Sequence, residues 1–252
     1  MREVVHTLFS QKRPGCPWDL LPPDLLPKST VDDYGCQWRA DGTWQKGLDA
    51  LREAVRQQAG RHPAPRAGRL ASQTVQGTAV GGARGDDGNT KGHGRQRPRI
   101  VDTLGLLLAI LVTAAAADDG TPAPQVLVKL DAQPHPRLAL LGADQQYNHQ
   151  TLQGWLARQQ VGDTIEVVER PVGTKGFVLF HRRWVVERPC AWRGRYRRNS
   201  KDYERLTASS AATVKVSMIH RMLRRLGPDK TKQMPAFTYS RKPPESCIKL
   251  SG

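Results

Sequence analysis

The chain has 252 residues, and its 39 Lys and Arg outnumber its 23 Asp and Glu, giving a formal net charge of +16. Hydrophobic residues make up 38% of the chain, beside 23 glycines and 18 prolines, which excludes a collagen, a coiled coil and a wholly disordered chain. We expect one or two domains with a real core, and the basic balance favours a polyanionic partner.

The first 62 residues show helical patterns. A predicted helix begins after Thr43, which we expect to cap it, and ends at Gly60. Its apolar residues recur at the spacing of one helix face: Trp44, Leu48, Leu51 and Val55. An earlier helix around residues 4–9 is broken at Pro14, and the prolines from 22 to 27 predict irregular connections. Three tryptophans are the expected core of this region: Trp18, Trp38 and Trp44.

After residue 62, strand-like and helical patterns alternate. Strands are predicted over 100–103, 106–113, 138–141 and 165–168, and helices over 123–130, 149–158, 182–191 and 208–226. Residues 77–94 are rich in glycine and predict a loop or the end of a hairpin. The alternation of strands and helices after residue 62 predicts an α/β layer fold. The last segment, 228–252, has four prolines and no periodicity, so we expect a disordered tail.

The cysteines and the termini favour an intracellular protein. The four cysteines are widely spread with no Cys-x-x-Cys pair, which predicts free thiols: Cys16, Cys36, Cys190 and Cys247. The N-terminus lacks the apolar run of a signal peptide. The apolar stretch Leu104–Ala117 is shorter than the roughly 20 residues that a spanning helix needs. We therefore expect a cytoplasmic protein without a membrane partner.

Positive charge is concentrated in one segment. Residues 182–232 contain 15 Lys and Arg but only four Asp and Glu, and aromatic residues are interleaved with the arginines. A cluster of this kind can neutralise DNA phosphates and supply affinity without sequence specificity. The alternative is a basic helix face exposed to solvent, but the concentration of charge favours nucleic acid.

The same segment carries a family resemblance. Residues 182–188 (RRWVVER) and 195–204 (RYRRNSKDYE) strongly resemble the bacterial insertion-sequence DDE transposases of the IS-four/IS-five type. Further segments agree in the same order along the chain: 15–22, 38–44 (WRADGTW), 72–75 (SQTV), 101–108 (VDTLGLLL), 143–147 (ADQQY), 170–171 and 176–178. The resemblance covers residues 1 to about 226.

The resemblance implies an RNase H-like mixed sheet flanked by helices. It divides the chain into a small helical N-terminal DNA-binding domain over 1–62, an RNase H-like DDE transposase domain over 63–227, and the tail over 228–252. It also implies DNA transposition by strand cleavage and transfer, with carboxylates that bind two Mg²⁺ or Mn²⁺ ions. By resemblance, Asp144 and Glu187 are catalytic metal ligands. Arg183 lies one helical turn before Glu187 and could orient its carboxylate or bind a phosphate.

DNA is the partner that this family implies. We expect double-stranded DNA at the inverted repeats of an element, bound by a homodimer in a nucleoid-associated protein. The residues expected to contact it are Arg182, Arg188, Arg195, Arg197, Arg198 and Lys201. Without the family, Asp144 would be interpreted as a solvated turn residue and Glu187 as a surface glutamate paired with arginine.

The chain also departs from the family pattern. The first family carboxylate belongs just before Ser72, where this chain has Ala71, which has no metal-binding atom. Three other acidic residues could in principle replace that carboxylate, but their spacing does not support it: Asp86, Asp87 and Asp102. Pro189 disrupts the helix expected to present Glu187, at a cost of about 3 kcal/mol. Residues 98–99 interrupt the usual entry to the strand at 100, Arg193 replaces an apolar residue, and the chain begins inside the expected N-terminal helical region.

These departures predict a truncated, degenerate copy. They leave two functions open: a transposase with impaired catalysis, or a non-catalytic transposase-derived protein that binds DNA as a regulator.

Overall fold

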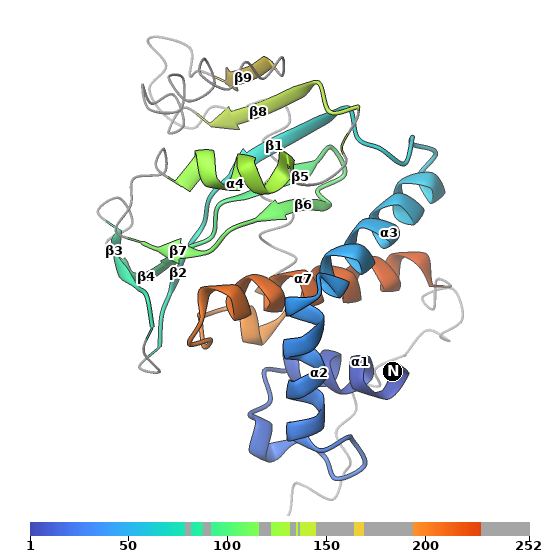
Figure 1. Cartoon of the computed structure of the whole chain (residues 1–252), viewed down its shortest axis with the longest axis vertical. Helices are drawn as coiled ribbons and strands as arrows, with labels where there is room; N and C mark the ends of the chain where they lie inside the picture. The colour runs from blue at the N-terminus through green and yellow to red at the C-terminus, as the bar shows by residue number, and fades with distance from the viewer. Residues whose placement is uncertain are drawn as a thin grey trace, which may run out of the picture.

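Three N-terminal helices gather with one long C-terminal helix on one side of a mixed sheet (Figure 1). The computed structural model describes residues 1–78, 82–87, 92–115, 122–131, 135, 137–144, 164–168 and 194–227. The predicted helices over 149–158 and 182–191, and the tail after 227, lie outside the described residues. The arrangement confirms the predicted α/β class, a mixed sheet flanked by helices, as in an RNase H-like core.

The main sheet has five strands in the order β6-β5-β1-β8-β9. Strand β5 (Arg99–Asp102) is antiparallel to both of its neighbours, β6 (Leu107–Ile110) and β1 (Ala67–Ala71). Strands β1, β8 (Leu140–Asp144) and β9 (Thr164–Val168) run parallel to one another. Every residue of β5 and β6 is buried, including the charged Arg99 and Asp102 at the two ends of β5.

A smaller sheet begins just beyond the C-terminal end of β1. It has the order β2-β4-β3, formed by β2 (Thr74–Gln76), β4 (Gly92–Gln96) and β3 (Gly85–Asp87), and the short β7 (Thr113–Ala114) also pairs with β4. The glycine-rich segment predicted as a hairpin end therefore forms the β3–β4 pair. Strand β5 begins at Arg99, so that residue continues into the strand, whereas we expected it to interrupt the entry.

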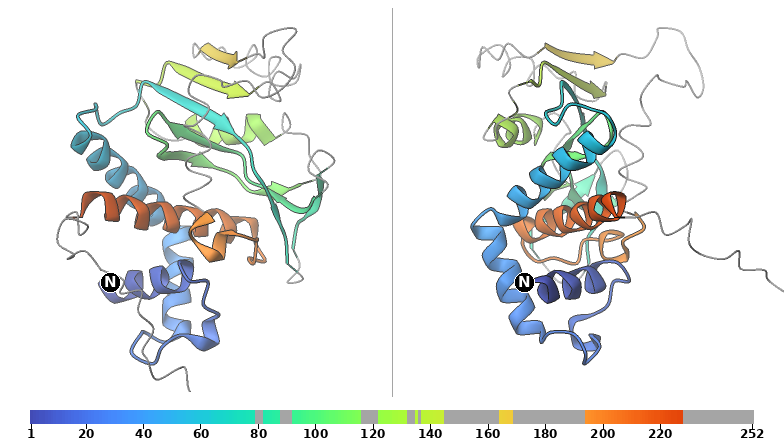
Figure 2. Two further views of the ribbon diagram at one scale, coloured as in Figure 1. Left: turned by 180° about the vertical axis from the view of Figure 1, so that it is seen from behind. Right: turned by 90° about the vertical axis from the view of Figure 1, so that its right-hand side faces the viewer.

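Helices cover both faces of the main sheet. Helix α4 (Pro122–Asp131) packs on one face, and α3 (Thr43–Gln58) and α7 (Thr207–Leu226) pack on the other, as Figure 2 shows from the side. Helices α1 (Arg2–Lys12) and α2 (Lys28–Ala40) pack below α7. One apolar cluster runs continuously from Val4 and Leu48 to Val101 and Val214, so the N-terminal helices and the sheet share a core.

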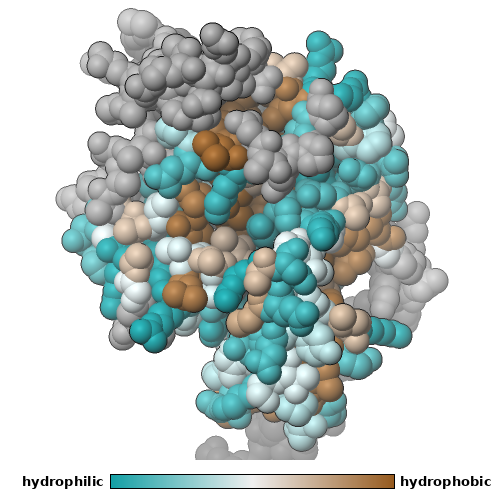
Figure 3. Space-filling view, in the orientation of Figure 1, coloured by the Kyte–Doolittle hydropathy of each residue, from teal (hydrophilic) through white to brown (hydrophobic). Residues whose placement is uncertain are grey.

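The predicted helix at 44–55 is confirmed as α3, but its cap differs. Gly42, in the left-handed conformation, is the N-cap, and Asp41 accepts a hydrogen bond from the Thr43 backbone N–H. Trp38 and Trp44 are buried with their rings 5.0 Å apart, edge to face, whereas Trp18 is only partly buried. Helix α2 was not predicted. It buries only Val31 and Trp38, and its outer face is largely hydrophilic (Figure 3).

Candidate functional site

The C-terminal ends of β1 and β8 lie side by side, where the resemblance places two of the carboxylates. Gly68 pairs with Leu141 and Arg69 with Gly142, and the same register carried on brings Ala71 level with Asp144. Asp144 is the last residue of β8 and pairs with Val168 of β9. The position of Asp144 at a strand end agrees with the prediction, and the neighbouring strand presents an alanine there.

The remaining catalytic predictions lie outside the described residues. They are Arg183 and Glu187, and the same holds for the DNA-binding candidates Arg182 and Arg188 and for Pro189, which we expected to disrupt a helix. The structure therefore neither brings them to Asp144 nor separates them from it. Within the described part of the chain, no group of three or more His, Cys, Asp or Glu side chains could hold a metal ion.

Two acidic side chains that could have replaced the missing carboxylate have structural partners. Asp102 is fully buried, forms an ion pair with Arg56 at 2.5 Å, and accepts hydrogen bonds from the Leu104 and Leu106 backbones. Asp86 pairs with His93 across the β3–β4 hairpin. Asp102 therefore stabilises the β5–β6 turn and its contact with α3. Asp86 lies on the small sheet, which is separate from the five-stranded one.

A buried ionic network lies between the small sheet and α7. Asp202 accepts hydrogen bonds from Arg95 at 3.1 Å, Arg97 at 3.2 Å and Ser210 at 2.6 Å. Its backbone also pairs with Gln76 of β2. Asp202 lies within the 195–204 segment that carries the family resemblance, and its role there is to join two parts of the fold. Sequence reasoning assigned it no role, because nothing in a charged run distinguishes a buried carboxylate from an exposed one.

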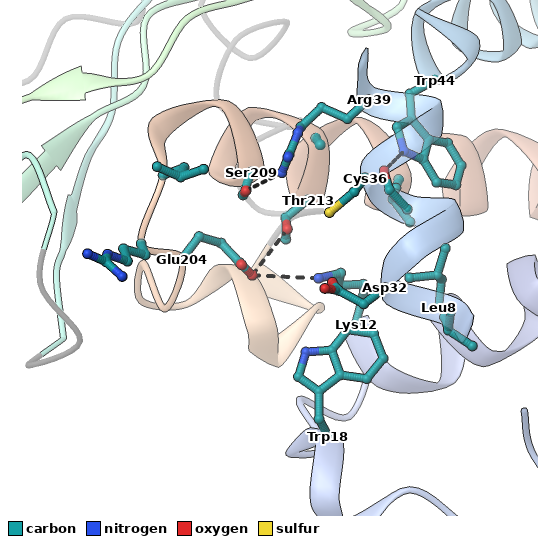
Figure 4. Close-up of a pocket in the computed structure, with 16 residues that line it drawn as sticks. Leu8, Lys12, Trp18, Asp32, Cys36, Arg39, Trp44, Glu204, Ser209 and Thr213 are labelled. Carbon is teal, nitrogen blue, oxygen red and sulfur yellow. Dashed lines mark hydrogen bonds and ion pairs between the residues drawn. The ribbon is translucent and has the colours of Figure 1, made fainter. Parts of the chain in front are cut away.

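A pocket between α1, α2 and α7 shows how the N-terminal helices attach (Figure 4). Glu204 lies 3.6 Å from the Lys12 amine and accepts hydrogen bonds from Arg198 and Thr213. Across the pocket, Arg39 of α2 donates a hydrogen bond to Ser209 of α7. The contacts of Lys12 with Glu204 and of Arg39 with Ser209 therefore join α1 and α2 to the α7 region, which indicates a structural role.

The charges in this pocket shift one another's pKa. Burial alone would raise the pKa of Glu204, but the neighbouring charges of Lys12 and Arg198 outweigh it, so the pKa is lowered. Burial lowers the pKa of Lys12, against the opposing effect of Glu204. Because Arg198 adds a second positive charge, Glu204 is ionised at neutral pH.

Exposed arginines gather where α1, the turn η3 (Arg197–Asn199) and α7 meet. The Arg197 backbone N–H donates a hydrogen bond to the Arg13 carbonyl at 3.0 Å, which joins the end of α1 to η3. We call the four exposed cations of this region the arginine patch: Arg13, Arg195, Arg197 and Arg224. None of them forms an ion pair with a carboxylate of the described residues.

An aromatic cluster lies beneath the arginine patch. The His220 ring stacks on Phe9 with centroids 4.3 Å apart and meets Tyr196 edge to face at 5.6 Å. Burial lowers the pKa of His220 to about 4, and the charges of Arg224 and Arg13 act in the same direction. The ring is therefore neutral at pH 7, and it links α1 to α7 below the patch.

The structure separates the predicted DNA-binding residues into two groups. Arg195, Arg197 and Lys201 are exposed and available to a partner. Arg198 is partly buried, forms an ion pair with Glu204 at 3.3 Å and lies over the Tyr203 ring, so its contacts are structural. Cys16 and Cys36 are free thiols, as predicted. In the described part of the chain, no helix is both long enough and apolar enough to cross a membrane.

Comparison with known proteins identifies the family. Residues 66–222 match the family model described as the transposase DDE domain. No curated protein matches the chain. The matched span begins one residue before β1 and ends within α7, so it contains all of the main sheet and more than half of the chain. The chain therefore belongs to the transposase DDE domain family.

Proposed function

We propose that this protein is an insertion-sequence transposase that binds double-stranded DNA and whose strand cleavage and transfer are impaired by Ala71. The observation that carries the proposal is that the same chain has an exposed arginine patch and, at the end of β1, Ala71 in place of the carboxylate that the family pattern expects. Family membership supports DNA as the molecule on which the protein acts. The finer assignments, to the IS-four/IS-five type and to the inverted repeats of an element, rest on the resemblance.

The arginine patch supports DNA binding by its composition and exposure. Its four members come from three segments that are far apart in the sequence, so the fold rather than a single basic helix brings them together. Guanidinium groups suit phosphate oxygens because they donate parallel hydrogen bonds, and neutralising phosphates releases counterions. Contacts of this kind position a duplex without specifying its sequence, so they account for affinity rather than for recognition of element ends.

The described residues do not fit a metal centre of the kind that the family implies. Two divalent ions, Mg²⁺ or Mn²⁺, require a set of carboxylate oxygens, and Ala71 supplies none at the end of β1. Asp144 and Glu187 remain the proposed ligands, with Arg183 as a proposed positioning residue. Two carboxylates would have to balance two doubly charged ions, which is why we propose that catalysis is impaired.

The absence of a carboxylate at residue 71 also favours a second candidate function. A chain that binds DNA without cleaving it could occupy element ends or pair with an intact transposase, and so act as a regulator. A homodimer on DNA remains part of the first proposal, since two element ends must be held together for transfer.

Two measurements on the purified full chain test the proposal. Fluorescence anisotropy with a random-sequence duplex in EDTA should show binding that weakens steeply as salt is added. Supercoiled plasmid incubated with the protein and Mn²⁺ should not be nicked beyond a control with Mn²⁺ alone. Nicking that requires Mn²⁺ and disappears in Asp144→Asn would show that catalysis is intact, and absence of salt-dependent binding would refute DNA binding.

A further inference from the structure

A cavity of about 510 Å³ lies at the edge of the main sheet, beside the outermost strand β6. That strand contacts α3, α4 and α7, and in Figure 1 it lies between α4 and α7. The cavity is lined by residues of β6 and of the helices α2, α3, α4 and α7. Its volume is typical of sites that hold a small ligand.

Positive charge lines this cavity. We call it the basic cavity, because four of its lining residues are cations, whereas none of the described residues that line it is Asp or Glu. The cations come from four different helices, so the fold rather than one basic stretch of sequence brings them together. Such a cavity favours an anionic occupant. The four cations are Arg39 of α2, Lys46 of α3, Lys129 of α4 and Lys215 of α7.

Two of these lysines repel each other. Burial lowers the pKa of Lys129, and burial is also the main cause that lowers the pKa of Lys215. The charge of Lys129 lowers the pKa of Lys215 further, whereas Asp49 opposes the shift without reversing it. Asp49 is already engaged on its own helix, where it accepts hydrogen bonds from Gln45 and Arg52.

The repulsion is not compensated by an ion pair. Neither Lys129 nor Lys215 forms one with a carboxylate in the described part of the chain. An anion bound between the two amines would relieve their repulsion, and the attraction would be stronger than in bulk water because both amines are partly desolvated.

The deep wall of the basic cavity is apolar. Ala109 and Ile110 of β6 are each 2% exposed, and Trp44 of α3 is also buried. The Trp44 indole N–H donates a hydrogen bond to a backbone carbonyl of α2, so the ring offers the cavity apolar surface. Lys46 and Lys129 are exposed by contrast, which places positive charge at the mouth. An apolar floor below a cationic mouth suits an organic molecule that carries phosphate groups.

We propose that the basic cavity binds a small phosphorylated molecule of nucleotide size, with its phosphates against Lys129 and Lys215 and its organic part against the apolar floor. The proposal goes beyond the binding of duplex DNA, and it uses neither residue 71 nor any member of the arginine patch. A double helix is too wide to enter a cavity of this volume, so the two ligands should bind independently.

Isothermal titration calorimetry of the full chain in EDTA, with ADP as the probe, tests the site. ADP should bind with one-to-one stoichiometry, and Lys129→Gln/Lys215→Gln should weaken binding about tenfold or more, because two charge-assisted contacts are lost. The control Lys28→Gln/Arg61→Gln removes the same charge from exposed positions outside the cavity and should leave the ADP affinity unchanged. Absence of ADP binding, or equal weakening in both variants, would overturn the proposal.

The two parts of the probe test the two parts of the cavity. Pyrophosphate and adenosine should each bind more weakly than ADP, because each contacts only the cations or only the floor. Pyrophosphate that binds as tightly as ADP would contradict the assignment of the floor to an organic group.

A second variant tests the cavity without changing charge. Ala208 lines it from an exposed position of α7, so Ala208→Trp should fill the space without disturbing the fold, which urea unfolding checks. We expect this variant to lose ADP affinity although all four cations remain. ADP binding as tight as in the native chain would show that the ligand lies elsewhere.

Duplex DNA separates this proposal from the proposed function. Lys129→Gln/Lys215→Gln should bind a random-sequence duplex as the native chain does, and saturating duplex should leave the ADP affinity unchanged. If the duplex displaces ADP and the variant weakens both ligands alike, the cavity belongs to the DNA surface and the proposal is wrong. ADP binding that persists without any duplex binding would refute the proposed function alone.

Discussion

Asp202 Oδ2 lies 3.2 Å from Nη2 of Arg97, and both side chains are almost inaccessible to water. A second guanidinium, from Arg95, binds the other oxygen of the same carboxylate. Because one carboxylate compensates two buried cations, it joins the small sheet to the start of α7. The chain segment that most resembles the transposases thus contributes to folding as well as to charge.

Removal of the Asp202 charge should destabilise the whole fold. We expect Asp202→Asn to lower the free energy of unfolding by about 3 kcal/mol, since it leaves two buried guanidinium groups without their counterion. Urea unfolding followed by circular dichroism measures this change. Asp19→Asn removes a carboxylate from the exposed pair with Lys28 and is the matched control, for which we expect no measurable change. Equal effects of the two substitutions would refute the role given to Asp202.

Glu204 should make stability depend on acid pH. Its pKa in the folded protein is lowered by Lys12 and Arg198, so its stabilising effect is present above the ordinary value of 4.5 and is lost as the pH falls through the lower folded value. Glu204→Gln should cost about 2 kcal/mol at pH 7 and flatten the loss of stability below pH 4.5. Thermal melts between pH 3 and pH 7 test this, and an unchanged acid limb in the variant would contradict it.

Protonation of His220 in the unfolded chain should cause a second loss of stability, at a higher pH than the loss caused by Glu204. Its pKa is about 4 in the folded protein against 6.5 when exposed, so the unfolded chain binds the extra proton as the pH falls from 6.5 to 4. Because the ring is partly exposed, we expect a loss on the order of 1 kcal/mol across this range. His220→Phe keeps the stack on Phe9 and should abolish the loss in melts at pH 7, 5.5 and 4. A loss of the same size in the variant would show that another group titrates.

The elements that could be predicted from sequence are those with a long periodic pattern. Helices α3 and α7 have a regular apolar stripe, and β6 is a continuous apolar run. Helix α2 could not be predicted, because Pro27 is equally typical of an irregular connection. That proline stands at the N-cap with an extended backbone, where its missing N–H is not needed.

The central strand could not be predicted for a different reason. β1 has the sequence AGRLA, in which only Leu70 is a large apolar residue, so no alternation is visible. Its place is determined by pairing with β5 on one side and β8 on the other, which are long-range contacts. Without β1, the position of Ala71 between β5 and β8 could not be recognised from the sequence.

The candidate site was predictable only in part. The order of motifs indicated Asp144 at a strand end and an alanine in the first carboxylate position. It could not distinguish Arg198 from Arg197, which are adjacent members of one basic run. The difference is the burial of Glu204, whose carboxylate pairs with Arg198 and leaves Arg197 exposed.

The arginine patch can be tested separately from the rest of the positive charge. The variant Arg13→Ala/Arg195→Ala/Arg197→Ala removes three exposed cations that form no ion pair with a carboxylate of the described residues, so we expect it to fold normally. A control variant removes three exposed cations from the region of α2 and α3: Lys28→Ala, Lys46→Ala and Arg61→Ala. Both variants have the same net charge.

The salt dependence of duplex binding in EDTA, measured for these two variants and the native chain, tests the central claim most directly. We predict that the patch variant binds more weakly and that the slope of log K against log salt falls by about 0.9 for each phosphate that is no longer neutralised. The control variant should keep a slope close to the native one. Identical slopes for the patch variant and the native chain would contradict the account, because they would place the DNA on another surface.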